Sequence, residues 1–371
     1  MTRKSNGKTT ARSAAQVRSL RSQIDRLDHQ IQKLLNVRAK TAGNLGNIKA
    51  ENAAEIFVPA REEEILQNLV ATNKGPLDPQ TVRSIFRELI SGSRALQKVL
   101  KVAYLGPEYG NSHQAMVERF GAAVEGIAVG SVAAVFEEVN RAHADFGIVP
   151  LENSTEGRLS DTLELFIRLP QLKIVAEVRV RVHHHLLSNA QQQEVRRIYS
   201  RSQILSQTRN WLSKNIPHAQ AVEVTSTSVA AELASREPGS GAIASRHAAN
   251  KYGLKVLFSD IEDNPIGESR FAVIGAETPE RTGKDRTAIM FQAAHRPGSL
   301  VEALNIFKIN KINLHAIESF PAKGSRAESM FFLDFDGHVQ DMRVKRAIET
   351  LNRKSERVIF LGSFPVSEAV E

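Results

Sequence analysis

Cysteine is absent from the 371-residue chain, and its absence removes several kinds of chemistry at once. The protein has no disulfide, no thiolate zinc site and no cysteine nucleophile, and the redox state of its compartment stays open. No apolar run reaches the roughly 18–20 residues that span a bilayer, and no apolar signal segment follows the N-terminus. We therefore expect a cytoplasmic protein with no membrane partner.

Acidic residues are missing from the first 24 positions, which hold six Lys or Arg before Asp25. We predict that residues 1–13 form a disordered basic tail. A transit peptide has a similar composition and is the alternative, although Arg21 already belongs to a predicted helix. Because this stretch carries most of the formal net charge of +8, the remaining cations suit small anions, and we expect no nucleic-acid partner.

The rest of the composition is ordinary for a globular protein, with 42% hydrophobic and 24% charged residues. A chain of this length is too long for one core, so we expect two or three domains. Neither a Gly-rich dinucleotide fingerprint nor a P-loop is present, which argues against NAD and ATP. We expect no cofactor.

Residues 14–100 show only helical patterns. The first helix has apolar residues at alternating steps of four and three, the spacing of one helical face: Leu20, Ile24, Leu27, Ile31 and Leu34. A second helix is predicted over residues 59–72, and a third from Asp78-Pro79 to about Leu100. One long and two short helices cannot enclose a core, so we expect the first helix to pair with a second chain in an intertwined dimer.

Cations interrupt the apolar face of the first helix. Arg38 takes the next position of the face, and Lys49 lies eleven residues later, ~20° away around the helix. Cations on an apolar face are costly unless an anion meets them. A dianionic ligand would supply that anion, and an interhelical salt bridge to Glu62 or Glu63 would do so equally well.

Five short motifs occur in the order and spacing of the all-helical type of chorismate mutase, which residues 17–98 resemble. They are Leu20-Arg21, Leu34-Leu35 with Arg38, Ile48-Lys49, Val58-Pro59-Ala60-Arg61-Glu62 and Ser93-Arg94-Ala95-Leu96-Gln97. The resemblance implies that Arg38 and Arg61, together with Arg21 of a partner subunit, bind the carboxylates of chorismate.

The same resemblance implies that Lys49 and Gln97 hydrogen-bond the ether oxygen, that Glu62 contacts the ring hydroxyl and that Ser93 lies nearby. The reaction is a pericyclic rearrangement, so catalysis consists of holding the dianion compactly and stabilising charge on the breaking ether oxygen. Arginine forks suit carboxylates, and lysine suits a single oxygen. Val58 departs from the family, since some relatives have an Asp there that contacts substrate.

Residues 101–279 alternate strands, polar turns and helices, which predicts an α/β domain with a largely parallel sheet. Strands are expected at residues 102–105, 146–149, 195–199, 222–224 and 242–244, and a last strand, 271–274, returns to the first lobe. Small polar residues follow five strands: Ser112, Asn153-Ser154-Thr155, Ser200 with Ser202, Ser226-Thr227-Ser228, and Ser245. Most would serve as helix caps in any such protein, but converging helix N-termini also suit a small dicarboxylate.

Longer motifs of this region occur in the order found in prephenate dehydratases, which residues 101–277 resemble. They are Tyr104-Leu105-Gly106-Pro107, Ser112-His113-Gln114-Ala115, Val149-Pro150-Leu151-Glu152-Asn153-Ser154, Ser226-Thr227-Ser228 and Ser269-Arg270-Phe271. The resemblance implies a two-lobed α/β domain, similar to periplasmic binding proteins, with prephenate between the lobes.

It further implies that Asn153, Gln207 and Ser269 are catalytic. Substrate-binding positions would be Ser112, Ser200, Ser226, Thr227 and Arg270. Prephenate loses water and carbon dioxide, and a hydroxyl donor in a desolvated site assists departure of the ring hydroxyl. The family usually has Thr at the position of Ser269, and serine keeps the hydroxyl. Tyr109-Gly110-Asn111 and Arg201-Ser202 are further departures.

The run His183-His184-His185 invites a metal site. Adjacent residues of a strand point to opposite faces, however, and cannot readily ligate one ion. No carboxylate cluster accompanies the three histidines in the sequence. We predict structural or crevice hydrogen bonds for them and no metal.

Residues 284–366 follow a βαββαβ order, which predicts an antiparallel sheet with helices on one face, and residues 278–284 are the linker. This segment resembles an ACT domain, a module that commonly binds amino acids at its interfaces. Pro297-Gly298-Ser299-Leu300-Val301 and Glu318-Ser319-Phe320-Pro321 match the phenylalanine-binding motifs of dehydratases, with Phe320 in place of the usual Arg. The resemblance implies feedback inhibition by L-phenylalanine; simple dimerisation is the alternative.

As a whole, the chain resembles the bifunctional chorismate mutase/prephenate dehydratases that carry a C-terminal ACT domain. The family implies a homodimer or homotetramer that takes chorismate to prephenate and then to phenylpyruvate in phenylalanine biosynthesis. Two alternatives remain: a dehydratase whose mutase region is degenerate, and a non-catalytic amino-acid sensor.

Overall fold

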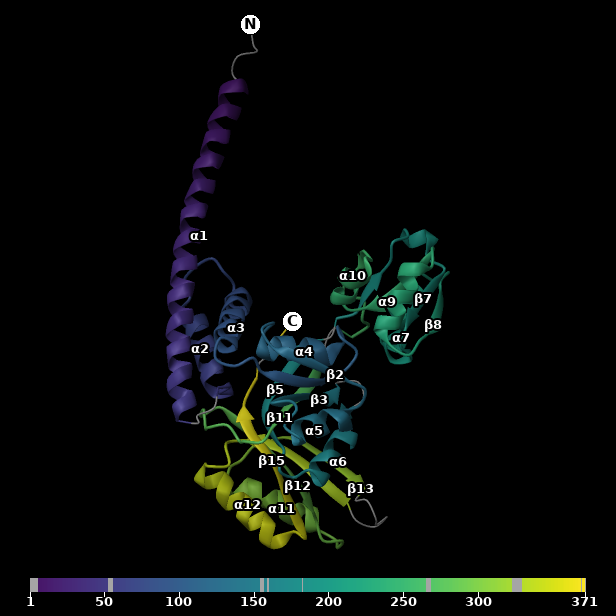
Figure 1. Ribbon diagram of the computed structural model, residues 1–371. Coiled ribbons are helices and arrows are strands. Elements are labelled where there is room, and N and C mark those ends of the chain that lie inside the picture. Colours follow the sequence, from purple (N-terminus) through teal and green to yellow (C-terminus); the bar gives the residue numbers. More distant parts are fainter. Residues whose placement is uncertain are drawn as a thin grey trace.

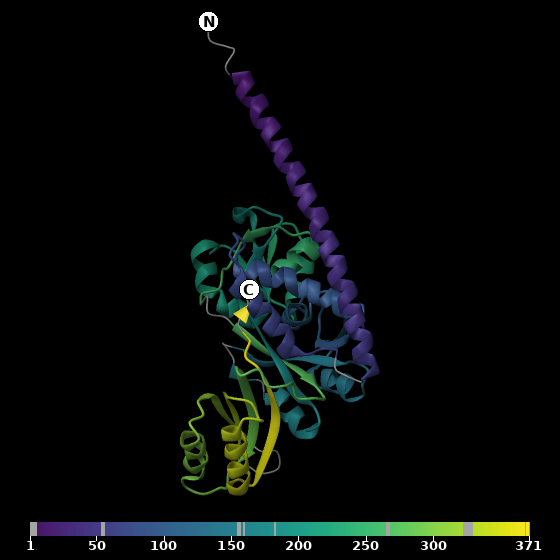
Figure 2. The ribbon, with the colours of Figure 1, turned by 90° about the vertical axis from the view of Figure 1, so that its left-hand side faces the viewer.

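The computed structural model describes residues 6–52, 56–153, 157–158, 160–181, 183–264, 268–321, 329–367 and 369–370. In this part the chain forms a helical region, a two-lobed α/β region and a C-terminal module (Figure 1). Figures 1 and 2 place the N-terminal end of the long first helix and the C-terminal module at opposite ends of the molecule. No helix of the described residues combines the length and the apolar character needed to cross a membrane.

Three helices form the N-terminal region: α1 (Asn6–Glu51), α2 (Pro59–Thr72) and α3 (Pro79–Ala95). The helix α1 begins at Asn6 and so includes residues 6–13 of the stretch that was predicted to be a disordered tail. Proline occupies the first turn of both α2 and α3, where a missing N–H costs nothing. The Asp78 carboxylate caps α3 by accepting from Thr81 N at 2.9 Å.

Much of α1 lies apart from the rest of the chain (Figure 2). Its apolar face is therefore open to solvent, and seven of its residues are each at least 47% exposed: Val17, Leu20, Ile24, Leu27, Ile31, Leu34 and Val37. A row of large apolar side chains on one exposed helical face is typical of a surface that a partner covers.

The first α/β lobe is built on a sheet with the strand order β16-β5-β11-β3-β1-β2, with β4 paired to β3. Its strands are β1 (Lys101–Leu105), β2 (Glu125–Val129), β3 (Phe146–Asn153), β4 (Gly157–Arg158), β5 (Lys173–Arg181), β11 (Glu268–Gly275) and β16 (Ala369–Val370). Its helices are α4 (Asn111–Phe120), α5 (Val132–Asn140) and α6 (Ser160–Arg168).

The last predicted strand does return to the first lobe, as β11, but it runs antiparallel to both β3 and β5. The expectation of a largely parallel sheet is therefore wrong for this lobe, whose sheet is mixed. The chain leaves the first lobe through β5 and returns to it through β11, which runs in the opposite direction. The two strands that connect the lobes are therefore antiparallel neighbours.

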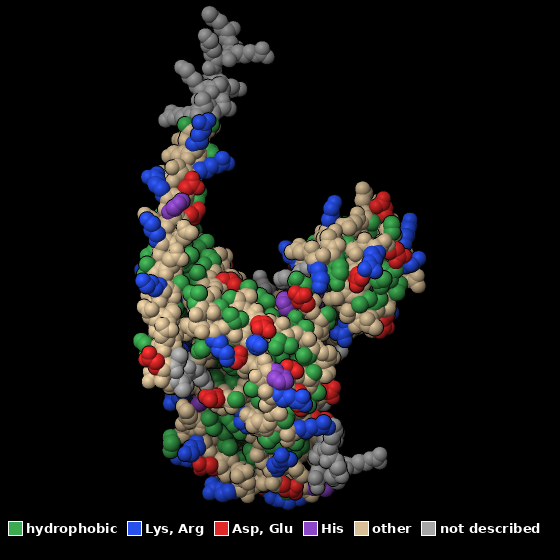
Figure 3. All heavy atoms as spheres, in the orientation of Figure 1, with side chains coloured by type: hydrophobic (Ala, Val, Ile, Leu, Met, Phe, Trp, Pro, Cys, Tyr) green, Lys and Arg blue, Asp and Glu red, His purple; other side chains and the backbone are tan. Residues whose placement is uncertain are grey.

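The second lobe has a five-stranded sheet with the order β10-β6-β9-β7-β8. Its elements are β6 (His185–Leu187), the 3-10 helix η1 (Gln192–Glu194), β7 (Arg197–Ser200), α7 (Ser202–Gln207), α8 (Arg209–Asn215), β8 (Gln220–Glu223), α9 (Thr227–Arg236), β9 (Ser240–Ala244), α10 (Arg246–Tyr252) and β10 (Val256–Phe258). In Figure 3 this lobe stands across a wide opening from the arm formed by α1.

The C-terminal module has the predicted βαββαβ order. Its elements are β12 (Asp285–Gln292), α11 (Ser299–Ile309), β13 (Leu314–Pro321), β14 (Ser329–Asp336), α12 (Met342–Lys354) and β15 (Arg357–Pro365). The strands lie in the order β13-β14-β12-β15 and every pair is antiparallel. One face of this sheet packs on its own helices through Phe291, Phe307 and Leu333.

The other face of the module packs on the first lobe. Met290, Phe332 and Leu361 of the module share one buried cluster with Val149 and Ile174 of the lobe. Close contact depends on Gly362, where φ is 154° and a Cβ atom would lie 2.1 Å from the carbonyl oxygen of Ile174. The module and the lobe therefore share one hydrophobic core.

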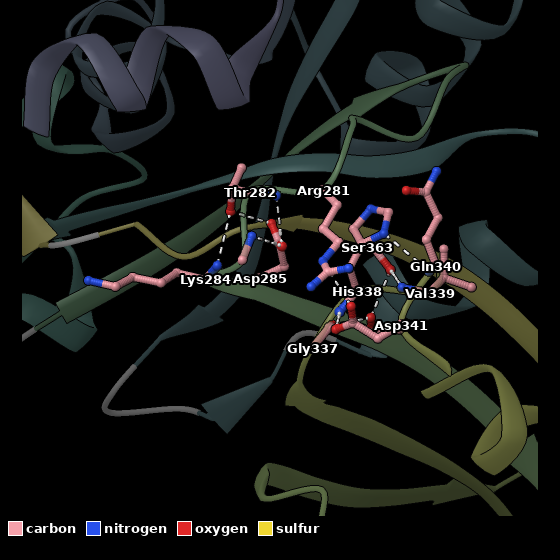
Figure 4. A network of polar contacts seen from close by, with 12 residues as sticks. Arg281, Thr282, Lys284, Asp285, Gly337, His338, Val339, Gln340, Asp341 and Ser363 are labelled. Carbon is pink, nitrogen blue, oxygen red and sulfur yellow. Dashed lines mark hydrogen bonds and ion pairs between the residues drawn. The ribbon is translucent and has the colours of Figure 1, made fainter. Parts of the chain in front are cut away.

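The linker before the module is also anchored, as Figure 4 shows. Asp285 accepts from both the N–H and the hydroxyl of Thr282, at 2.9 and 2.6 Å. His338 is buried and accepts from Gln340 N at Nδ1, so its Nε2 carries the proton and donates to the Pro279 carbonyl at 3.0 Å. These bonds fix the linker against the turn that follows β14.

Candidate functional site

The helical region brings two of the predicted chorismate ligands together. Arg38 of α1 donates from Nη1 to the hydroxyl of Ser93 on α3 at 2.7 Å and to the Leu89 carbonyl at 3.2 Å. Arg38 is half-buried, and its guanidinium therefore faces the neighbouring helix. Lys49 is also half-buried, near the C-terminal end of α1.

Gln97 lies against the same helix, at a position where α1 has Gly46. A Cβ atom at Gly46 would lie 2.3 Å from Gln97 Cγ, so only glycine leaves room for the Gln97 side chain there. The Oε1 atom of Gln97 is buried and accepts no hydrogen bond from the described residues. Gly46 was missed in the sequence, where a lone glycine inside a long helical pattern is a weak signal.

Glu62 and Arg61 are placed differently. The Glu62 carboxylate pairs with Arg94, which is buried, and lies 3.6 Å from Arg119 of α4. Glu63 pairs with Arg83 at 3.1 Å. Neither glutamate forms the interhelical salt bridge to Arg38 that was the alternative reading of the buried cations. Arg61 is exposed and pairs with Glu64 on its own helix.

This junction between the helical region and the first lobe contains a cavity of about 300 Å³, lined by α2, α3, α4, β5 and residues 365–367. Burial lowers the pKa of Arg119, and the carboxylate of Glu62 opposes that shift. Arg119 also lies over the ring of Phe57, 5.0 Å from its centroid. Within a single chain, Glu62 thus serves the contact between two domains, and its predicted role toward chorismate stays a prediction.

Arg21 and Val58 complete the helical set. Arg21 is exposed on α1, seventeen residues or about 25 Å of helix before Arg38. It can join that site only from another chain, as the family resemblance implies. Val58 precedes α2 at its N-cap position and provides no side-chain hydrogen bond there, whereas an Asp would.

In the α/β region, Ser269 lies on β11 and its backbone pairs in register with Asn153 of β3. The side chain of Asn153 and the neighbouring residues 154–156 lie outside the described part of the chain. Ser269 is nearly buried, and Ser112 is buried in the first turn of α4 on the same lobe. The first lobe therefore holds two of the hydroxyl groups predicted for the dehydratase site, those of Ser269 and Ser112.

The second lobe contributes Gln207 at the end of α7. Its Oε1 accepts a hydrogen bond from Nε2 of His184 at 2.7 Å. Burial lowers the pKa of His184, which favours the neutral ring.

The remaining serines of the second lobe have structural partners. Ser200 is fully buried and donates to the Ile243 carbonyl at 2.8 Å. Ser226 caps α9 by accepting from Val229 N at 3.1 Å, the capping role that its position also predicted. Thr227 begins the same helix and is half-buried.

Arg270 is placed among carboxylates. Its Nε lies 2.6 Å from Glu177 Oε2 and its Nη2 lies 2.6 Å from Asp334 Oδ2, while Nη1 is 3.5 Å from Glu152. Burial opposes its charge, but Glu177 and Asp334 outweigh that effect and raise the pKa of Arg270. This cation is already neutralised by the protein, which differs from the expected role of a free substrate-binding arginine.

A contact between α10 of the second lobe and the residues before α4 joins the two lobes, and no sequence motif predicted it. Lys251 of α10 lies 4.6 Å from the ring centroid of Tyr109 and 4.0 Å from the carboxylate of Glu108. Tyr109 has φ = 68°, a conformation that is uncommon for a bulky residue and often occurs at functional sites.

The expectation that no carboxylate accompanies the three histidines is wrong. His183 Nδ1 lies 2.8 Å from Glu262 and 3.5 Å from Asp260, and ligand atoms of these three residues all lie within 4.8 Å of one another. His184 contacts Gln207 instead, whereas His185 lies beside the same Asp260, with its Nδ1 3.5 Å from the Asp260 carboxylate. Asp260 and Glu262 lie in the segment that leads back to the first lobe, whereas His183 lies in the segment that leaves it. The cluster therefore joins the two segments that connect the lobes.

The predicted effector motifs lie at two places in the C-terminal module. Gly298 precedes α11 with φ = 85°, a conformation that favours glycine, and Pro297, Ser299, Leu300 and Val301 flank it. Glu318 and Ser319 lie on β13, which is an outer strand of its sheet.

Taken together, these features are those of an enzyme in two parts: a helical region with half-buried Arg38 and Lys49, and an α/β region with buried hydroxyl groups at Ser112 and Ser269. Residues 20–98 match the chorismate mutase type II family, and residues 102–279 match prephenate dehydratase. The chain belongs to the family of bifunctional chorismate mutase/prephenate dehydratases.

The relatives agree over the whole chain. A bifunctional chorismate mutase/prephenate dehydratase of Aquifex aeolicus is 39% identical over 94% of this chain and 98% of its own length. One of Stutzerimonas stutzeri is 38% identical over 95% of this chain. The crystal structure of a prephenate dehydratase from Arthrobacter aurescens in complex with L-Phe is 32% identical, with a TM-score of 0.67 over 72% of this chain and 90% of that one.

Proposed function

We propose that the chain rearranges chorismate to prephenate in the helical region and converts prephenate to phenylpyruvate in the α/β region, as steps of phenylalanine biosynthesis. The observation that carries this conclusion is the presence of both matched regions in one chain, with relatives of the same two-part name aligned over 94–95% of it.

In the helical site, Arg38 and Ser93 hold one end of the chorismate dianion. Gln97 and Lys49 stabilise negative charge on the ether oxygen as its bond breaks. No proton has to move and no covalent intermediate forms, so the contribution of these groups is orientation and electrostatic stabilisation. Arg21 reaches the site from the second chain, whose α1 covers the exposed apolar face of this one. We accordingly propose a homodimer formed through α1.

In the α/β site, prephenate binds between the lobes, an arrangement like that of two-lobed binding proteins. The carbon–carboxylate bond breaks to release carbon dioxide, and its electron pair makes the ring aromatic. The ring hydroxyl departs with one added proton as water. Ser269 donates a hydrogen bond to that departing oxygen, and Gln207 contributes to the site from the second lobe. Asn153 completes the set from the strand beside Ser269.

We further propose that the C-terminal module is an ACT domain that binds L-phenylalanine and inhibits the dehydratase. Support comes from its βαββαβ order, from Gly298 at the start of α11, and from the related dehydratase that was crystallised with L-Phe. Phe320 replaces the usual arginine of the second motif, and we expect this exchange to weaken effector binding rather than abolish it.

A coupled assay on the purified full-length chain tests both activities. Chorismate should yield phenylpyruvate, and prephenate alone should yield it too; added phenylalanine should slow the second step. Phenylpyruvate from prephenate but not from chorismate would show a degenerate mutase. Turnover of neither substrate, with phenylalanine still bound, would show a sensor instead of an enzyme.

A further inference from the structure

The buried carboxylate of Asp334 belongs to the C-terminal module and yet it faces the dehydratase lobe. Asp334 lies on β14 and is fully buried. The cations that face it are Arg270 of β11, at 2.6 Å, and Arg286 of β12, at 3.7 Å. The contact with Arg270 Nη2 is close but off the direction of a hydrogen bond, so the pairing is chiefly ionic. A carboxylate in this position is tolerated only because the arginines neutralise it.

Arg270 is held from both sides by this arrangement. Glu177 of β5 binds its Nε from within the lobe, and Asp334 binds its Nη2 from the module. Glu177 is itself almost fully buried and has Arg179 as a second partner, at 3.2 Å. The guanidinium therefore bridges two sheets of one chain, and its position depends on both.

Ser269 directly precedes Arg270 on β11. Neighbouring strand residues point to opposite faces, so the Ser269 hydroxyl faces away from the module while the Arg270 guanidinium faces it. The register of β11 against β3 shifts between Arg270 and Phe271, immediately after this pair. The ladder to β3 is thus interrupted one position beyond Ser269, and the ion pairs of Arg270 hold the strand at that point.

From this geometry we infer that Asp334 is a positioning residue of the dehydratase site: through Arg270 it sets the placement of Ser269, and the C-terminal module is thereby part of the catalytic architecture itself. The inference rests on the proposed role of Ser269. It does not require that the module bind phenylalanine, so it holds whether or not the enzyme is feedback-inhibited.

The test is Asp334→Asn in the full-length chain, with kcat and KM measured for prephenate and mutase activity measured in the same sample. We expect the dehydratase kcat to fall about tenfold or more, because a misplaced Ser269 hydroxyl stabilises the transition state less well. The KM for prephenate and the mutase activity should stay within about twofold of wild type. Asp336→Asn is the matched control, because Asp336 is on the same strand but exposed and paired with His315. A kcat within twofold of wild type in Asp334→Asn would overturn the inference.

A second comparison tests the inference even if Asp334→Asn folds poorly. Arg270→Gln and the double variant Arg270→Gln, Asp334→Asn should have the same reduced dehydratase kcat, because Asp334 acts only through Arg270. The double variant has one unpaired buried carboxylate fewer than Arg270→Gln, so it should fold at least as well as that single variant. A further drop of kcat in the double variant would contradict the inference. Failure of the Ser269 assignment is detected separately by Ser269→Ala, which would then retain its activity.

Discussion

Arg38 of the long N-terminal helix donates a hydrogen bond to the hydroxyl of Ser93 on α3 at 2.7 Å. This contact spans 55 positions of sequence and places a cation from an otherwise exposed helix against a neighbouring helix. Part of the proposed chorismate site is therefore already formed within one chain.

Replacing Arg38 by alanine should remove only the first activity. We expect mutase kcat/KM to fall by about 10²–10³-fold, because a charge-stabilising donor is lost, while dehydratase activity on prephenate is unchanged. Arg26→Ala is the control, since Arg26 is exposed on the same helix and donates to the Ser22 carbonyl. Mutase activity that survives in Arg38→Ala would mean that the site lies elsewhere.

Gly46 allows a sharper test of the same site. In Gly46→Ala the new methyl group would lie within 2.8 Å of three Gln97 side-chain atoms, and the flexible Gln97 must move away. We expect mutase kcat/KM to fall by about tenfold or more with the dehydratase unaffected. Gly43→Ala is a matched control, because nothing lies within 4 Å of that position. It should only stabilise the helix, by about 0.5–1 kcal/mol. Equal mutase rates in the two variants would argue against a role for Gln97.

Ser269 should matter for the second activity alone. Removing its hydroxyl in Ser269→Ala should lower the dehydratase kcat by about 10²–10⁴-fold, whereas Ser269→Thr, which keeps the hydroxyl, should retain most of the rate. Steady-state kinetics on prephenate measures both. Ser213→Ala, an exposed serine of α8 that donates to the Asn210 carbonyl, should have no effect. A loss in Ser269→Thr as large as in Ser269→Ala would show that packing, not the hydroxyl, is what counts.

His184 predicts a pH dependence of stability. Burial holds its folded pKa below the ordinary value of about 6.5, so the unfolded chain takes up a proton first as the pH falls. Stability is therefore complete above about pH 6.5 and decreases below it. The thermal midpoint should drop between pH 7.5 and 5.5, and by less in His184→Gln than in the wild type.

Two neighbouring groups, His185 and Glu262, also affect how stability depends on pH. Burial also lowers the pKa of His185, which therefore adds to the slope in both proteins. Burial would raise the pKa of Glu262, but hydrogen bonds from His184 N and His183 outweigh it and lower that pKa, so its contribution is lost only below about pH 4.3. His218→Gln, at an exposed position, should leave the slope as in the wild type. An unchanged slope in His184→Gln would contradict the prediction.

Helices and strands were predicted well where residues close in the sequence mark their ends. The bounds of α2 agree with the predicted residues 59–72 because Pro59 marks the start of that helix. The strand β5 was missed. Its central residue is the charged Glu177, which reads as exposed until its partner Arg270, 93 positions later, is known.

Site residues were harder to predict for the same reason. Glu62 is assigned to the mutase by its motif, yet its observed partners include Arg119, which belongs to the next domain. The carboxylates beside His183 are nearly 80 positions away in the sequence. A motif identifies which residues belong to a family, but their partners are decided by packing between distant segments, which no periodicity records.

The shared core between the C-terminal module and the first lobe restricts how this enzyme can change over evolution. A gene that lost the module would leave Ile174 and its neighbours without the sheet that covers them, and the remaining chain would lose part of its interior. If the module regulates the enzyme as proposed, regulation can therefore be altered by single substitutions in the predicted effector motifs, such as the phenylalanine at position 320, but not by deletion. The C-terminal module is inherited together with the lobe that it covers.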